Sequence, residues 1–155
     1  MDSIFVSGIA CAAPIAALAA LLSAQPGQAE MPRTASLEVT VTGIKSAKGV
    51  IQLAICPAGV GFPDCKDKAV RTAKLTIQNG QAHATFAGLA PGSYAVSVFH
   101  DANSNGKLDT FMGIPKEGYG FSRNPGFKPR APKFAEAEVV VQGQTETTIK
   151  LRYLM

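Results

Sequence analysis

Tryptophan is absent from this 155-residue chain, aromatic residues make up only 7% of it, and charged residues only 17%. So few charges beside 46% hydrophobic residues exclude a disordered polyelectrolyte and a coiled coil. Helical spacing of apolar residues over ten or more positions is also lacking after residue 35. Turn-forming residues are plentiful, with 15 glycines and 10 prolines. This balance favours one loop-rich, all-β domain over a helical bundle.

Only one hydrophobic run is long enough to cross a membrane, and it lies at residues 4–22. It is rich in alanine, contains a proline and leads to small residues up to Ala29, which is typical of a secretory signal peptide. We therefore expect residues 1–29 to be cleaved after Ala29, or alternatively after Ala24, which would make the product periplasmic or secreted. No Lys or Arg precedes the run, and a membrane anchor or a lipoprotein acylated at Cys11 are the competing interpretations.

Cysteine is scarce, with three in the chain, and removal of residues 1–29 would leave Cys56 and Cys65. An even pair in an exported protein predicts one disulfide. A metal pair or a redox couple is disfavoured, because the spacing is not C-x-x-C and no histidine lies nearby in the sequence. Since the predicted loop is short, the disulfide would stabilise the fold by about 2–3 kcal/mol.

From Ser36 onward, apolar and polar residues alternate with a period of two. Seven such runs are separated by turn residues, and Asn79-Gly80 predicts a type I′ hairpin turn. Strands with one apolar and one polar face are expected to stack as two sheets, with a closed barrel as the alternative. The residues expected on the apolar faces of the seven strands are Leu37, Val39 and Val41, Ile51, Leu53 and Ile55, Leu75 and Ile77, Ala82, Ala84 and Phe86, Tyr94, Val96 and Val98, Val139 and Val141, and Thr147, Ile149, Leu151 and Tyr153.

The pattern divides the chain into three parts. We predict a signal peptide at 1–29, an N-terminal extension at 30–35 and a single domain at 36–155. The predicted domain is a seven-stranded antiparallel β-sandwich of the immunoglobulin or transthyretin type, with a long ordered loop after its fifth strand.

Alternation stops for about thirty residues after His100, and a loop of this length in a compact domain usually carries function. Its first part, 101–109, places oxygen-bearing side chains at relative positions 1, 3, 5 and 9 and glycine at 6, which is the spacing of an EF-hand calcium loop. Position 12 is Met112 in place of a bidentate glutamate. The competing hypothesis is therefore a polar turn held by its own hydrogen bonds. The candidate calcium ligands are Asp101, Asn103, Asn105, Lys107, Asp109 and Glu117.

Aromatic and cationic residues alternate in the rest of this stretch, a combination that can stack on rings and attract anions. In the alternative interpretation, the aromatic rings fold back over one end of the sandwich and the cations form its solvated rim. Nucleic acid is disfavoured as a partner of an exported protein whose formal net charge is only +4. The candidate ligand-facing residues are Tyr119, Phe121, Ser122 and Arg123.

Catalytic constellations are sparse, and the sequence predicts no catalytic residue. The chain has only two histidines and no nucleophile-elbow motif beside Ser122. We predict a non-catalytic binding or accessory module that meets an envelope polymer or another protein. The alternative is a small periplasmic hydrolase that uses His100, Glu117 and the aspartates of the loop.

Three blocks, at residues 88–96, 100–109 and 113–122, together resemble a bacterial family known as domain of unknown function 2141. The resemblance runs from about Ser36 to the C-terminus and implies an exported protein with no established activity. The chain departs from the family at Phe111-Met112, where a more polar pair with an asparagine is expected. More distantly, the Leu-x-Pro-Gly-x-Tyr turn is similar to transthyretin-like and carboxypeptidase-regulatory-like β-sandwiches, which are mostly accessory modules.

Overall fold

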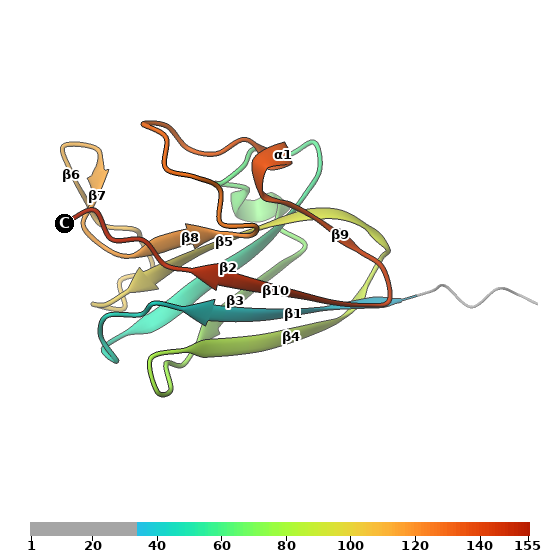
Figure 1. Cartoon of the computed structure of the whole chain (residues 1–155), viewed down its shortest axis with the longest axis horizontal. Coiled ribbons are helices and arrows are strands. Elements are labelled where there is room, and N and C mark those ends of the chain that lie inside the picture. The colour runs from blue at the N-terminus through green and yellow to red at the C-terminus, as the bar shows by residue number, and fades with distance from the viewer. Residues whose placement is uncertain (1–33) are drawn as a thin grey trace, which may run out of the picture.

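The computed structural model describes residues 34–155, which form an all-β fold with almost no helix (Figure 1). The predicted signal peptide, both of its cleavage sites and Cys11 lie outside these residues. The described elements are β1 (Ala35–Thr42), β2 (Val50–Pro57), the 3₁₀ helix η1 (Lys66–Lys68), β3 (Arg71–Leu75), β4 (Ala82–Leu89), β5 (Gly92–Asp101), β6 (Thr110–Phe111), β7 (Ile114–Pro115), β8 (Tyr119–Phe121), α1 (Phe134–Ala137), β9 (Glu138–Val141) and β10 (Gln144–Lys150).

Two sheets face each other across one hydrophobic core. The smaller sheet has the order β10-β1-β4, and Figure 1 shows these strands side by side. The larger sheet has the order β3-β2-β5-β8, and β9 also pairs with β5. Strands β6 and β7 form a separate hairpin that projects from the sheets (Figure 1). The fully buried side chains of the core come from both sheets and include Leu37, Val39, Val41, Ile51, Ile55, Val96, Val141 and Ile149.

The alternation of apolar and polar residues explains the long strands. In β1, the side chains of Leu37, Val39 and Val41 are buried, while Glu38 between them is exposed. Successive side chains of a strand point to opposite faces, so each such run buries one face only. The class predicted from the sequence, all-β, is confirmed.

The predicted number and direction of the strands need correction. The described residues contain ten strands rather than seven, and β1 pairs with β10 in parallel, with Ser36 opposite Gln144 and Thr42 opposite Lys150. Alternation shows which face of a strand is buried but not which strand lies beside it. The additional strands, β6, β7 and β8, have two or three residues each, which is too short for a period of two to be visible.

The turn predicted at Asn79-Gly80 is confirmed, but the strands that it joins, β3 and β4, do not pair as the predicted hairpin. Both residues have positive φ, 51° and 74°, and the backbones of Gln78 and Gln81 exchange hydrogen bonds of 2.8 and 3.0 Å. This geometry is that of a type I′ turn. The turn carries the chain from β3 in the larger sheet to β4 in the smaller one.

The residues that follow β10 join the two sheets along one side. Arg152 exchanges backbone hydrogen bonds of 2.8 and 2.9 Å with Tyr119 of β8. The neighbouring glycines allow this close approach, because a Cβ at Gly118 would lie 2.3 Å from the Tyr153 ring, and one at Gly120 would lie 2.7 Å from Ile149. Within residues 34–155, no helix is long and apolar enough to cross a membrane.

Candidate functional site

The polar loop, residues 101–109, is built around the buried carboxylate of Asp101. One oxygen of this carboxylate accepts a hydrogen bond from the backbone N–H of Asn105 at 2.9 Å. The other accepts from the N–H of Gly106 at 2.8 Å and from Nε2 of Gln52 at 2.9 Å. Burial on its own raises the pKa of Asp101, but these hydrogen bonds outweigh it and hold the pKa below its ordinary value of 3.8.

The remaining candidate calcium ligands also use their oxygens inside the chain. The side-chain amides of Asn103 and Asn105 donate to the Asp109 carboxylate at 2.8 and 3.1 Å. Glu117 accepts from the backbone N–H groups of Ala102 and Asp109, both at 2.9 Å. Lys107 contributes its own N–H, which donates to the Asn105 side chain at 2.8 Å. The loop therefore closes by Asx-type hydrogen bonds, as the competing hypothesis predicts.

These contacts leave calcium as a prediction from spacing. Asp101, Glu117 and Asp109 share one region of the fold, and each carboxylate already accepts hydrogen bonds from the chain. Over residues 34–155, no three His, Cys, Asp or Glu side chains gather as a potential metal site.

His100, the centre of the hydrolase alternative, is only 2% exposed. Its Nε2 lies 2.7 Å from the carbonyl of Lys48, which can only accept, so Nε2 donates. Its Nδ1 lies 2.9 Å from the hydroxyl of Tyr153, whose pKa is raised by burial and which therefore stays a neutral partner. On the described surface, two hollows lie on the outer face of the larger sheet, and a smaller one lies between β8 and the end of β10. His100 lines none of these three hollows. No observation therefore favours hydrolysis.

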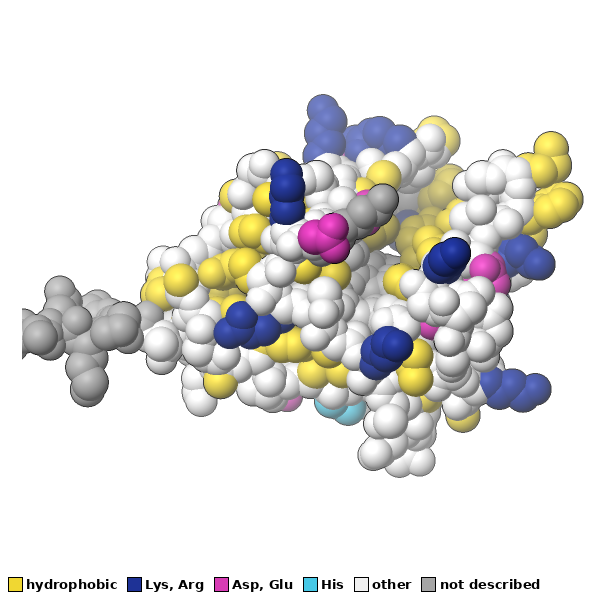
Figure 2. Space-filling view, turned by 180° about the vertical axis from the view of Figure 1, so that it is seen from behind, with side chains coloured by type: hydrophobic (Ala, Val, Ile, Leu, Met, Phe, Trp, Pro, Cys, Tyr) yellow, Lys and Arg dark blue, Asp and Glu magenta, His cyan; other side chains and the backbone are white. Residues whose placement is uncertain are grey.

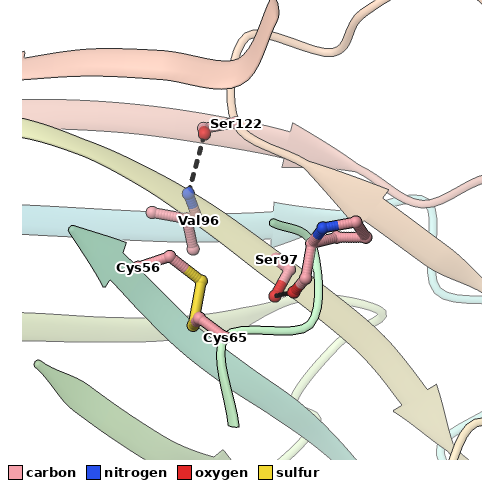
Figure 3. Close-up of a disulfide and its surroundings, with 6 residues drawn as sticks. Cys56, Cys65, Val96, Ser97 and Ser122 are labelled. Atoms are coloured by element: carbon pink, nitrogen blue, oxygen red, sulfur yellow. Dashed lines mark hydrogen bonds between the residues drawn. A yellow bond between two sulfur atoms is a disulfide. The ribbon is translucent and has the colours of Figure 1, made fainter. Parts of the chain in front are cut away.

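Ser122 is buried rather than ligand-facing, because it follows β8 and anchors that strand to β5. Its hydroxyl donates to the carbonyl of Ala137 and accepts from the backbone N–H of Val96 at 2.9 Å (Figure 3). Three residues of strand give no readable period, so the sequence carried no sign of this burial. The Ser122 side chain thus holds β8 in place.

Tyr119 and Phe121 point away from the core, because Gly120 between them faces Ile149. They line two adjoining hollows of about 700 and 610 Å³ on the outer face of the larger sheet. We call these hollows together the groove. Figure 2 shows the surface hollowed between two projections, with hydrophobic side chains inside. Two predicted ligand-facing residues thus form the floor of a real concavity.

The walls of the groove come from three segments that are distant in sequence. One wall is the β6–β7 hairpin, which contributes Ile114 and Pro115. The opposite wall is the proline segment, residues 125–132, which includes Phe127. The third is the loop closed by the disulfide, which contributes Pro63. A volume of this size and an apolar lining are usual for a small-molecule site.

The predicted disulfide is present and positions the third wall. Cys56 and Cys65 are joined, with their Cα atoms 5.8 Å apart. Within this loop the carbonyl of Pro63 accepts from the Ser97 hydroxyl at 3.1 Å, beside β5 (Figure 3). The Phe62 ring packs edge-on against Phe121, with ring centroids 5.7 Å apart. The disulfide thereby holds an aromatic ring against the floor of the groove.

Positive charge surrounds the proline segment. Arg130 binds both oxygens of Glu136 at 2.8 and 3.0 Å, and Lys128 contacts the same carboxylate. The bond from Arg130, and after it the bond from Lys128, lower the pKa of Glu136 well below its usual range. The Arg152 guanidinium lies 5.8 Å from the centre of the Phe127 ring. One carboxylate shared by two cations leaves this wall with a net positive charge.

A family model described as an uncharacterized protein conserved in bacteria (DUF2141) matches residues 39–150, which extend from within β1 to the end of β10. The chain belongs to the DUF2141 family. No curated protein and no solved structure matches it significantly. The family resemblance inferred from the sequence is therefore confirmed, whereas the similarity to transthyretin-like sandwiches stays a prediction.

In this DUF2141 domain, several residues of the groove were not among the predicted site residues. Leu108, Ile114 and Arg152 line it, whereas the predicted Arg123 lines none of the three hollows. These residues are apolar or belong to the C-terminal strand pattern, so nothing in the local sequence marks them as parts of a binding site. Only the fold brings them to the same place.

Proposed function

We propose that this DUF2141 domain is an exported, non-catalytic binding module that takes an apolar, negatively charged ligand in the groove. The observation that carries the proposal is the groove itself, with an aromatic floor of Tyr119 and Phe121 and an apolar wall beside Arg152. An apolar pocket with a few converging polar groups is the usual form of a ligand site.

The negative charge proposed for the ligand follows from the cation that lines the groove. Arg152 donates to the carbonyl of Pro125 at 3.3 Å and, within residues 34–155, has no carboxylate partner among its hydrogen bonds. A cation in this position can meet an anionic group while the Phe127 ring beside it meets an apolar one. A ligand with one anionic and one apolar part could contact the Arg152 guanidinium and the Phe127 ring at the same time.

The export part of the proposal rests on the sequence of residues 1–29. The Cys56–Cys65 disulfide supports it, because such bonds persist in oxidising compartments. Calcium in the 101–109 loop remains a separable addition, since the groove does not use the carboxylates of that loop.

The test uses 1-anilinonaphthalene-8-sulfonate, which joins an apolar ring system to an anion. Because the chain has no tryptophan, Phe127→Trp creates a single fluorescent reporter on the groove wall. We expect saturable quenching with one probe per chain, and about tenfold weaker binding in Phe127→Trp/Arg152→Gln. Linear, unsaturable quenching would contradict the proposal.

Val140→Trp is the matched control. Val140 is an exposed apolar residue of β9, 56% accessible, and it lines none of the three hollows. A tryptophan there is expected to show no saturable quenching. Equal quenching of both reporters would mean that the dye binds without regard to the groove.

A further inference from the structure

The tip of the β6–β7 hairpin exposes three large apolar side chains to solvent. Met112 is 88% exposed, Phe111 60% and Ile114 48%. Phe127, also 60% exposed, lies on the facing wall of the groove. Such a cluster is costly in water, and contiguous apolar patches of this kind mark interaction sites.

The turn at the tip is chemically unusual. Phe111 pairs with Ile114, so Met112 and Gly113 are the two turn residues, with φ of 51° and 80°. A type I′ turn needs positive φ at both positions and therefore prefers Asn, Asp or Gly at the first. Methionine fits neither the backbone of this turn nor the solvent around it.

The same chain contains the ordinary form of this turn for comparison. Asn79-Gly80 joins β3 to β4 with φ of 51° and 74°, which match the φ values of Met112 and Gly113 within a few degrees. There the first position holds the preferred asparagine. Met112 therefore replaces a residue that the chain uses elsewhere for the same backbone, which indicates that its side chain serves a contact outside the molecule.

The hollow beside the tip, which Ile114 lines, is also lined by Lys128, Arg130 and Arg152 and by one carboxylate, Glu136, so its charge is positive on balance. Within residues 102–133, every exposed charged residue is basic, while Glu117 is buried and Asp109 is half-buried. The hydrogen bonds that close the polar loop thus also engage the carboxylates of Asp109 and Glu117. The exposed cations of this stretch are Lys107, Lys116, Arg123, Lys128, Arg130 and Lys133.

From this combination we infer that the hairpin tip docks on an anionic lipid surface, with Phe111, Met112 and Ile114 entering the interface and the surrounding cations meeting lipid headgroups. Insertion of apolar side chains flanked by Lys and Arg is how peripheral proteins bind anionic membranes. A stable protein interface uses about 20–30 residues per partner, whereas this patch consists of three side chains on a projecting hairpin, so insertion into lipid suits it better than a protein contact.

The test places the reporter at the tip itself, so that other parts of the full chain do not contribute to the signal. Phe111→Trp introduces the only tryptophan. We expect its emission to shift to the blue with vesicles containing phosphatidylglycerol, and to stay unchanged with pure phosphatidylcholine vesicles. The shift should weaken as sodium chloride is raised.

The decisive variant is Phe111→Trp/Met112→Asn. Asparagine gives the turn its preferred residue, so the fold should be as stable as before or slightly more so, while vesicle binding reported by the tip falls about tenfold. Val140→Trp on β9 is the control and should show no shift. An unshifted tip reporter, an equal shift at residue 140, or undiminished vesicle binding by the double variant would each overturn the inference.

This experiment also separates the inference from the proposed function. Phe111 and Met112 line none of the three hollows, so their variants should bind the naphthalene probe in the groove normally. Loss of lipid binding with intact dye binding supports docking by the tip. Loss of dye binding with intact lipid binding would contradict only the proposed function.

Discussion

Two neighbouring regions of the stretch after β5 are built in opposite ways. The polar loop, 101–109, binds its side chains to its own backbone and amides, and the buried Asp101 alone accepts three hydrogen bonds from the chain. The β6–β7 hairpin, which follows at once, directs Phe111 and Met112 outward with no described partner in the core. The loop with the EF-hand spacing satisfies its polar groups internally, whereas the hairpin with the hydrophobic sequence exposes its apolar side chains.

The largest loss of stability is expected when a glycine that packs against the polar loop is replaced by alanine. Gly49 lies against the start of the polar loop, and a Cβ there would lie 2.0 Å from the carbonyl oxygen of Asp101, in a backbone with φ of 74°. We expect Gly49→Ala to lower the free energy of unfolding by about 3 kcal/mol or more, measured by urea denaturation.

Gly113 in the hairpin provides the matched substitution. It also has positive φ, 80°, but a Cβ there would meet nothing within 4 Å. Gly113→Ala should therefore cost only about 1 kcal/mol, which is the backbone term alone. Equal losses in the two variants would contradict the contrast between a fitted loop and a free hairpin.

A smaller effect is expected from Asp101→Asn. The amide group would place N–H donors against at least one backbone N–H or the Gln52 amide, so we expect a loss of about 2 kcal/mol near neutral pH. Glu146→Gln, on an exposed position of β10, is the control and should leave the unfolding midpoint almost unchanged.

The same variant predicts a change in pH dependence. Because folding lowers the pKa of Asp101, its carboxylate stabilises the fold above pH 3.8, and this contribution disappears as the pH falls through the lower pKa of the folded state. Acid titration of stability should be flatter in Asp101→Asn than in the parent chain. An identical acid profile in both would show that this carboxylate is not coupled to folding.

The smallest effect is expected from calcium. The carboxylates of Asp101, Asp109 and Glu117 already accept hydrogen bonds from the chain, and a bound ion would have to displace some of them. Millimolar calcium or EDTA should therefore shift the melting temperature by less than about 1 °C. A clear rise with calcium that EDTA reverses would show instead that the EF-hand spacing describes a true site.

The strands that are long enough to show alternating apolar and polar residues could be predicted from the sequence. Leu37, Val39 and Val41 in β1 and Ile149 in β10 are buried as the alternation predicts. The Asn79-Gly80 turn and the Cys56–Cys65 disulfide also follow from short-range chemistry. These features depend on neighbours within a few residues, and therefore they are legible in one sequence.

The groove could not be reached in this way, because its residues meet only through the fold. Pro63, Ile114 and Arg152 come from three separate segments and share no local pattern. Ser122 looked like a loop hydroxyl, yet it is buried against Val96 and Ala137 because a three-residue strand pairs there. Side-chain exposure is a tertiary property, and this is the property that distinguishes Met112 from a core methionine.

The parallel pairing of β1 with β10 sets the order in which the domain can be completed. β1 is the central strand of its sheet, and its neighbour β10 is the last strand described, roughly 100 residues later. At about 5–20 residues per second, a ribosome needs some 5–20 seconds to supply that neighbour. Until then β1 lacks one of its two neighbours, so the three-stranded sheet cannot be complete before the C-terminal strand has been synthesised.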